Sequence, residues 1–153
     1  MRRTSLRGAV CPLARSLDEI GDWWTLMIVR DALRGARRFS EFEKSLGLAK
    51  NILAQRLRQL IANGIMELRP AADGGARSEY HLTEKGRRLQ LVLVALRQWG
   101  ADNLFGTGEE ISVMVETATG QPIGQLKLVA EDGRPLGLDE VSVVRRTAGR
   151  AAT

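Results

Sequence analysis

The stretch FSEFEKSLGLAKNILAQRLRQLIANGIMELR, residues 39–69, contains two segments of helical period followed by one of period two. Ser40 is placed to cap the first helix, with Glu41 in its first turn, where a carboxylate is favoured. Gly47 ends that helix, and a second helix is predicted from Ala49 to Asn63, where an Asn-Gly pair stops it. Two short helices joined by about three residues that include a glycine are typical of a helix-turn-helix.

A β-hairpin is predicted directly after these helices, because the hydrophobic pattern changes to alternation. The segments IMELR (65–69) and RSEYHL (77–82) alternate apolar and polar residues on either side of the turn-rich PAADGGA. A hairpin that follows a helix-turn-helix gives the order of a winged helix-turn-helix. The residues expected to face the core are Met66, Leu68, Tyr80 and Leu82.

Two further helices are predicted upstream. In CPLARSLDEIG, Pro12 suits the first turn of a helix. In DWWTLMIVRDALRG, Asp22 is a candidate N-cap and Gly35 follows the C-terminus. The dense apolar residues of this second segment indicate a central core helix, and we interpret Trp23 and Trp24 as core residues.

The last helical segment, EKGRRLQLVLVALRQWGADNLF (84–105), begins after the strong N-cap Thr83 and is apolar nearly all round. Such a helix must be covered on more than one face. A small domain covers one face, so we expect a second copy of the chain to cover the other in a homodimer. The alternative is that the tail beyond residue 108 folds back over this helix. The predicted dimer-interface residues are Leu89, Leu91, Val92, Val94, Ala95, Leu96 and Trp99.

Length and composition predict a soluble, cytoplasmic protein. The 153 residues are 44% hydrophobic, enough for one domain with a core and an appendage. The longest apolar run, LVLVAL, is too short to span a bilayer, and the N-terminus lacks the apolar region of a signal peptide. Residues 1–108 carry a net charge of +7 and residues 109–153 one of −2, which give the total of +5. A basic body favours a polyanionic partner such as DNA.

The sequence predicts a mainly α fold with little β structure. We expect a winged helix-turn-helix domain with a long C-terminal dimerisation helix over residues 11–108, and a small β-rich extension over 109–146. Residues 1–8 and 147–153 are expected to be disordered. The extension repeats a Gly-x-Pro-x-Gly pattern, and three short strands are predicted around it, at Val113/Val115, Leu126/Leu128 and Val141/Val143.

The helix over residues 49–63 has two chemically different sides. Leu53, Leu57, Leu60 and Ile61 form the side expected to be buried. On the other side, Asn or Gln could pair bidentately with adenine and Arg with guanine in the major groove of DNA. The predicted base-reading residues are Lys50, Asn51 and Gln55, while Arg56 and Arg58 could reach a base or a phosphate or form an internal ion pair. The predicted phosphate contacts are Arg37, Arg38, Ser40, Arg69 and Arg77.

Cys11 is the single cysteine, which excludes an intrachain disulfide and a Cys-rich zinc site. It precedes Pro12 at a helix N-terminus, with Arg7 and Arg15 close in sequence, and both features favour a thiolate that could sense oxidants. The alternative is that Cys11 is a small buried apolar residue. The sequence contains no catalytic triad, two-histidine metal site or Walker loop, so we expect no enzymatic activity, metal or cofactor.

With this order of elements, residues 11 to about 105 closely resemble the HxlR-type winged helix-turn-helix regulators of bacteria, cousins of the MarR family. The resemblance rests on the N-terminal Cys-Pro, the block GDWWTLMIVRDALRGARRFSEF, the helix LAQRLRQLIANGI and the segment YHLTEKG. It implies a dimeric transcription factor that acts as a local repressor or activator and has no catalytic activity. Some members of the family sense through a cysteine at the position of Cys11.

Two other functions stay open at this point. The first is a protein-interaction module that uses the acidic β-rich tail as its partner surface. The second adds a small-molecule effector, bound between the last helix and Trp23, Trp24 or Trp99. The sequence offers no polar constellation by which to name that effector.

Overall fold

The computed structural model describes residues 5–75 and 77–145. The chain divides into two compact units, Met1–Arg97 and Gln98–Thr153. The boundary between these units lies inside the last long helix, and the predicted domain bounds of 11–108 and 109–146 stay a prediction. None of the described helices is long and apolar enough to cross a membrane.

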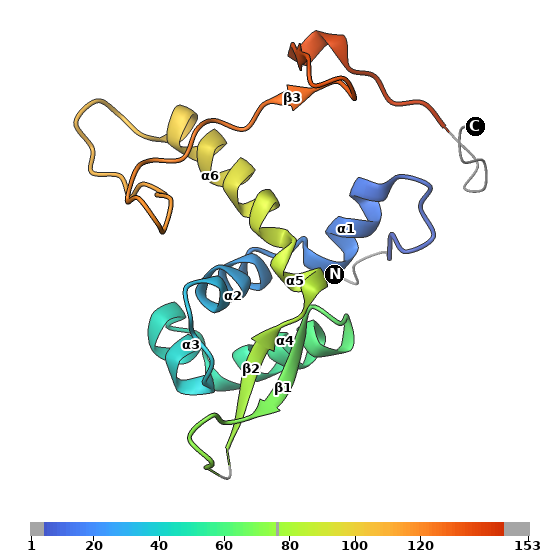
Figure 1. Ribbon diagram of the computed structural model, residues 1–153. Helices are drawn as coiled ribbons and strands as arrows, with labels where there is room; N and C mark the ends of the chain where they lie inside the picture. Colours follow the sequence, from blue (N-terminus) through green and yellow to red (C-terminus); the bar gives the residue numbers. More distant parts are fainter. Residues whose placement is uncertain (1–4, 76, 146–153) are drawn as a thin grey trace. The chain divides into compact units, whose positions relative to one another are not determined.

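The first unit contains the predicted winged helix-turn-helix order (Figure 1). The segment expected to be one helix over residues 84–105 is interrupted at Arg88 and forms α5 and α6. The bounds are α1 Pro12–Ile20, α2 Trp23–Leu33, α3 Phe39–Leu46, α4 Lys50–Ala62, β1 Met66–Pro70, β2 Ser78–Leu82, α5 Glu84–Arg87 and α6 Leu89–Leu104.

The core of this unit lies where α2, α3, α4 and the base of the hairpin meet. Ile28 and Val29 of α2, Phe42 of α3 and Leu53 of α4 are fully buried. Tyr80 of β2 packs against this core and meets the ring of Phe42 edge-on, with ring centroids 6.2 Å apart. The core thus fixes α3 and α4 against the hairpin, which positions the polar side of α4.

Side-chain caps start two of these helices as predicted. The Thr25 N–H donates to Asp22 Oδ1 (3.1 Å) at the start of α2. The Gly86 N–H donates to Thr83 Oγ1 (3.1 Å) at the start of α5. Asp22 and Thr83 are therefore confirmed as N-caps.

The start of α3 differs from the prediction. Its N-cap position is Arg38, so Ser40 lies within the first turn and does not cap the helix. Instead, Glu41 Oε2 accepts the backbone N–H groups of Arg37 (2.6 Å) and Arg38 (2.8 Å). These two hydrogen bonds hold the pKa of the Glu41 carboxyl below its usual range. The carboxylate of Glu41 therefore accepts hydrogen bonds at the start of α3, a role that was predicted for the hydroxyl of Ser40.

The two strands form an antiparallel hairpin with Met66 opposite Leu82 and Leu68 opposite Tyr80. Met66 and Leu82 are buried, but Leu68 is 51% exposed. The prediction that Leu68 faces the core was wrong, because the hairpin extends beyond the helices toward its tip (Figure 1). The Tyr80 N–H also donates to the carbonyl of Arg37 (2.8 Å), so the segment before α3 lies beside β2.

The second unit has little regular structure. Its described elements are β3 Leu128–Val129, β4 Pro135–Leu136 and the 3₁₀ helix η1 Leu138–Glu140, with an isolated bridge between Val115 and Pro122. Gln98 joins α6 to this unit, since its side chain donates to the Gly124 carbonyl (3.0 Å) and accepts the Leu126 N–H (2.8 Å).

The predicted three strands of this unit are only partly found. Leu128 lies in a strand, whereas Val113, Val141 and Val143 do not, and Val143 is 99% exposed. The first glycine of each Gly-x-Pro-x-Gly pattern has a left-handed backbone, with φ of 69° at Gly120 and 85° at Gly133. Each pattern therefore makes a tight turn, and β pairing is confined to the few residues that flank this turn.

The described part of the N-terminal segment contacts α1. Ser5 Oγ and the Leu6 N–H both donate to the carboxylate of Asp18, at 3.1 and 2.9 Å. The expectation of disorder for residues 1–8 stays a prediction. Residues 1–4 and 147–153, also expected to be disordered, lie outside the described residues.

Candidate nucleic-acid interface

Helix α4 is one residue shorter at each end than the predicted Ala49–Asn63, and it has the two predicted sides, except that Ile61 is only half-buried. Its buried side consists of Leu53, Leu57 and Leu60, each at most 1% exposed. The side chains of four polar residues are exposed and available to a ligand: Lys50, Asn51, Gln55 and Arg58. Gly47, with φ of 63°, allows the sharp turn between α3 and α4.

The two arginines of α4 that the sequence left open differ in their surroundings. Arg56 is half-buried, and its Nη1 lies 3.4 Å from Asp22 Oδ2, the cap of α2. This favours the internal ion pair for Arg56. Arg58 is exposed on the outward side, so it stays available for a base or a phosphate.

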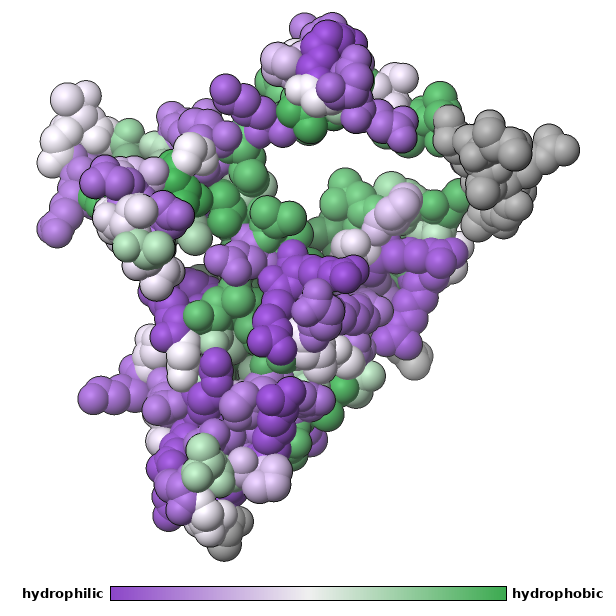
Figure 2. Space-filling view, viewed as in Figure 1, coloured by the Kyte–Doolittle hydropathy of each residue, from purple (hydrophilic) through white to green (hydrophobic). Residues whose placement is uncertain are grey.

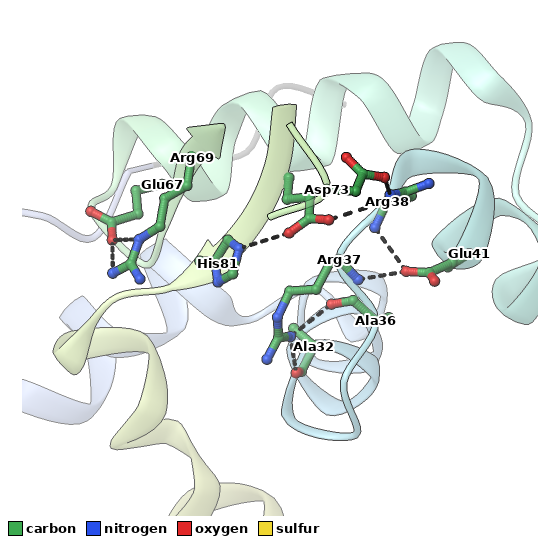
Figure 3. Close-up of polar contacts among 10 residues, drawn as sticks. Ala32, Ala36, Arg37, Arg38, Glu41, Glu67, Arg69, Asp73 and His81 are labelled. Atoms are coloured by element: carbon green, nitrogen blue, oxygen red, sulfur yellow. Dashed lines mark hydrogen bonds and ion pairs between the residues drawn. The ribbon is translucent and has the colours of Figure 1, made fainter. Parts of the chain in front are cut away.

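The residues predicted to contact phosphate differ in how firmly their side chains are already bound within the chain (Figure 3). Arg37 Nη1 donates to the carbonyls of Ala32 (2.6 Å) and Ala36 (2.8 Å), which satisfies acceptors at the C-terminal end of α2. Arg69 Nε donates to Glu67 Oε1 at 2.8 Å, within one strand. Arg37 therefore has a structural role, and Arg69 must exchange a carboxylate for a phosphate before it can bind one.

Arg38 connects the start of α3 to the hairpin. Its Nη2 lies 2.6 Å from Asp73 Oδ2 at the hairpin tip, and its Nε lies 3.7 Å from Glu79 Oε1. The hydrogen bond to Asp73 raises the pKa of the Arg38 guanidinium. The pKa of Asp73 is lowered, first by the Gly75 N–H and then by Arg38. Because both side chains are exposed, phosphate could replace Asp73 here at little cost.

A hollow of about 430 Å³ lies between the start of α3 and the hairpin. Ser40 and Arg77, both exposed, line it together with Arg38. The first N–H groups of a helix and nearby arginines are a favourable combination for a phosphate group. Phe39, Leu68 and Tyr80 supply the apolar part of the lining.

The carboxylates around these arginines were not identified from the sequence as part of the site. Glu67 and Glu79 pair with residues on the same strand or on α3, and Asp73 is at the tip. The alternation of the hairpin already places Glu67, Arg69, Glu79 and His81 on one face, which is the signal that could have revealed them.

Cys11 is exposed at the N-cap position of α1, so the alternative that it is a buried apolar residue was wrong. The two nearby arginines that were expected to favour its thiolate each have another partner. Arg15 Nε donates to the Ala9 carbonyl (2.6 Å), and Arg7 Nε lies 3.6 Å from Asp18 Oδ2. Exposure, and not a cluster of arginines, is thus the feature that makes the Cys11 thiol available.

Fewer residues are exposed on the apolar face of α6 than were predicted to form the dimer interface. Leu89 packs against the core of the first unit and Val94 is only 5% exposed, so these two side chains are already covered within the chain. Figure 2 shows apolar side chains at the surface where Figure 1 places α6. The exposed members are Leu91, Val92, Ala95, Leu96 and Trp99.

The two tryptophans of α2 have different environments. Trp24 packs against the core, as predicted, but Trp23 is 64% exposed and stacks on it with ring centroids 3.8 Å apart. The prediction of core packing therefore fails for Trp23, which lies at the first helical position of α2.

The comparison that decides the family is the match of the HxlR-like helix-turn-helix model to residues 19–107. The chain belongs to this family. This HxlR-like chain is 40% identical over 92 residues to Rv3095 of Mycobacterium tuberculosis, an uncharacterized HTH-type transcriptional regulator. That match covers 60% of this chain and 58% of Rv3095, so it spans less than two thirds of the mycobacterial protein.

Two solved structures extend this comparison. The crystal structure of PA1607, a candidate transcription factor, is similar with a TM-score of 0.88 and 52% identity, covering 94% of this chain and 100% of that one. The redox regulator HypR in its reduced form gives a TM-score of 0.55 at 31% identity, covering 61% of this chain and 93% of that one. The HxlR-like fold of the first unit is therefore shared with regulators of this family.

Proposed function

We propose that this HxlR-like chain is a sequence-specific transcriptional regulator of the cytoplasm that binds a palindromic operator as a homodimer and has no catalytic activity. The observation that carries the proposal is the exposed polar side of α4, which lies opposite the fully buried leucines within a winged helix-turn-helix. Family membership and the net charge of +5 on the whole chain support it.

Base recognition is assigned to Lys50, Asn51 and Gln55, with Arg58 as a further candidate. Asn51 and Gln55 are one turn apart on the exposed side, and Lys50 begins the helix. In helix-turn-helix proteins the N-terminal part of the second helix meets the base edges. Lys50 Nζ is 3.9 Å from Glu43 Oε1, a long and exposed ion pair that a DNA contact can easily replace.

Phosphate binding is assigned mainly to Ser40 and Arg77, which are exposed beside the same hollow. Arg38 and Arg69 are secondary, because each must first leave a carboxylate. Arg37 is withdrawn from the direct contacts, since it does not line this hollow and its Nη1 is held by two carbonyls of the chain.

The homodimer is proposed to form through the exposed face of α6. Leu91, Val92 and Leu96 are 66%, 41% and 49% exposed, which is unfavourable for adjacent large apolar side chains in water. A second copy of the chain would cover this face by an isologous contact.

The proposal is tested by selecting binding sites for the full chain from random duplex DNA. A dimeric reader should enrich a palindrome with half-sites about one helical turn apart, and its affinity for that site should fall steeply with salt. Binding that is salt-sensitive but enriches no sequence would contradict the proposal. That result would favour the protein-interaction module, in which the net charge of −2 over residues 109–153 marks the partner surface.

We also propose that Cys11 makes the regulator responsive to oxidants. Its thiol is exposed, and the similar protein HypR is described as a redox regulator. Because the chain has one cysteine, a disulfide must join it to another molecule, either a second chain or a small thiol. Diamide would accept the two electrons and two protons that this disulfide releases.

The effect of Cys11 is measured as DNA affinity before and after diamide treatment, for the wild-type chain and for Cys11→Ser. We expect a change of severalfold in the wild type, reversed by dithiothreitol, and none in the variant. An equal response of both proteins, or none in either, would exclude Cys11 as the sensor. Mass spectrometry identifies whether the added group is a second chain or the small thiol.

A further inference from the structure

A second hollow, of about 200 Å³, lies away from the first, between the end of α2, the base of the hairpin and α5. Its polar lining consists of Arg37, Arg69, His81 and Arg87. The apolar lining comes from Ala32, Leu33 and Leu82. Figure 3 shows Arg69 and His81 on the hairpin, with Arg37 next to them. No carboxylate is among the residues that line this hollow.

The three arginines of this hollow are only partly neutralised. Glu67 pairs with Arg69, and Glu79 Oε2 lies 3.3 Å from His81 Nε2. Among residues 5–75 and 77–145, no carboxylate lies within ion-pair distance of the guanidinium of Arg37 or of Arg87. The hollow therefore has an excess of positive charge, which an anion would stabilise.

Arg37 is held in place before any ligand arrives. Its Nη1 is fixed by the carbonyls of Ala32 and Ala36, and its own carbonyl accepts the Tyr80 N–H at 2.8 Å. A guanidinium that is already oriented loses little conformational freedom when it binds a carboxylate. The remaining N–H groups of Arg37 can then be offered to the hollow.

The apolar side of the hollow limits the kind of anion. An inorganic ion would use only the charged part of the lining, whereas an organic acid would also contact Leu33 and Leu82, which line the hollow from the edge of the core, with its carbon skeleton. The volume is below the roughly 300 Å³ at which drug-sized ligands begin to fit. The ligand must therefore be small, about the size of one ring with one acidic group.

We propose that this hollow is a binding site for a small organic carboxylate, whose charged group contacts Arg37 and Arg87 and whose apolar body contacts Leu33 and Leu82. The proposal rests on the geometry of the first unit and does not depend on the function proposed above. It assigns Arg87, on the surface of α5, a role that neither the DNA contacts nor the core requires.

The test is calorimetric titration of the full chain, without DNA, with benzoate, with its uncharged counterpart benzamide, and with inorganic phosphate. We expect saturable binding of benzoate, no measurable binding of benzamide, and at least about tenfold weaker binding of phosphate. The variant Arg87→Gln should bind benzoate about tenfold more weakly, as loss of a charge-assisted hydrogen bond predicts.

The matched control is Arg88→Gln, which removes the same charge from the neighbouring position. Arg88 does not line the hollow, and its exposed side chain pairs with Glu84 at 3.2 Å. It should bind benzoate like the wild type. The proposal is overturned if benzoate does not saturate a site, if benzamide or phosphate binds equally well, or if Arg87→Gln and Arg88→Gln behave alike. Because the titration contains no DNA, failure of the DNA-binding proposal would leave its result unchanged.

Discussion

Gln55 and Arg77 are both exposed, but they are placed for different contacts. Gln55 lies on the outward side of α4, and Arg77 lies beside the hollow at the start of α3. A side chain on a recognition helix can hydrogen-bond to a base edge. A side chain on the hairpin reaches the sugar-phosphate backbone of the DNA, which is the same for every DNA sequence.

We predict that Gln55→Ala lowers discrimination between the selected operator and a single-base variant by about 1–3 kcal/mol and leaves affinity for scrambled DNA unchanged. Arg77→Ala should instead weaken binding to both DNAs by a similar factor and reduce the salt slope by about one. Fluorescence anisotropy at several salt concentrations measures both effects. Equal losses on operator and scrambled DNA for Gln55→Ala would contradict its role in base reading.

Gly86 is the described glycine at which an added side chain would have the least room. A Cβ at this position would lie 2.2 Å from the Ile65 carbonyl oxygen and 3.0 Å from Leu82 Cδ2. Gly86→Ala must therefore push α5 away from the base of the hairpin, and we expect it to lower the free energy of unfolding by about 1–3 kcal/mol or more.

Gly100→Ala is the control for Gly86→Ala. It lies inside α6, and its added Cβ would meet nothing closer than Leu104 Cδ1 at 3.9 Å. Since alanine favours a helix over glycine by up to about 1 kcal/mol, this variant should be as stable as the wild type or more stable. Urea unfolding monitored by circular dichroism compares the two. A Gly86→Ala variant of wild-type stability would show that the close approach can relax.

At the scale of the element, α3 illustrates how a short helix is started by a side chain from inside its own first turn. Glu41 accepts two backbone N–H groups that would otherwise lack a partner. These hydrogen bonds favour the ionised carboxylate, which is why the pKa of Glu41 is lowered. The segment that carries Arg37 and Arg38 is thereby held against α3.

This arrangement predicts a pH-dependent contribution to stability. A carboxyl whose pKa is lower in the folded state stabilises the fold above its unfolded pKa, about 4.3 for Glu, and this contribution disappears as the pH falls through the folded pKa. Glu41→Gln should therefore destabilise the chain at pH 7, and the difference from the wild type should shrink on acidification.

Unfolding by urea at pH 7 and at successively lower pH values measures that difference. Glu43→Gln is the matched control on the same helix, since the Glu43 carboxylate makes only the 3.9 Å contact with Lys50. It should change stability little at any pH. A difference between Glu41→Gln and the wild type that is constant with pH would mean that the hydrogen bonds do not depend on ionisation.

The elements themselves were largely predictable, because their signals are local. The bounds of α4 lie within one residue of those predicted, and Asp22 and Thr83 cap their helices as their side chains favour. The errors occurred where several local signals competed. Ser40 was predicted to cap α3, although Glu41 accepts the hydrogen bonds there. Leu68 was predicted to face the core from the alternation of β1, although it lies beyond the edge of the core.

At the scale of the whole molecule, the first unit leaves an apolar face of α6 uncovered. We predict that Leu96→Glu shifts the chain from dimer to monomer, because a charge would be buried without a partner in the proposed interface. Gln90→Glu adds the same charge to an exposed position of the same helix and should leave the dimer intact. Sedimentation velocity measures the two oligomeric states. A wild-type monomer at micromolar concentration, or dimers in both variants, would contradict the proposed interface.

The sequence by itself determined the family resemblance, the winged helix-turn-helix order and the two sides of α4. These follow from residue spacing along a single element, and spacing is visible in the sequence. The tertiary structure decided which charged residues are free. Arg37 is bound to the carbonyls of Ala32 and Ala36, Arg56 faces Asp22, and Arg38 reaches Asp73 at the hairpin tip. The partners of Arg38 and Arg56 are distant in the chain, and those of Arg37 depend on how the backbone turns after α2, so the role of each arginine is decided by contacts that only the folded chain makes.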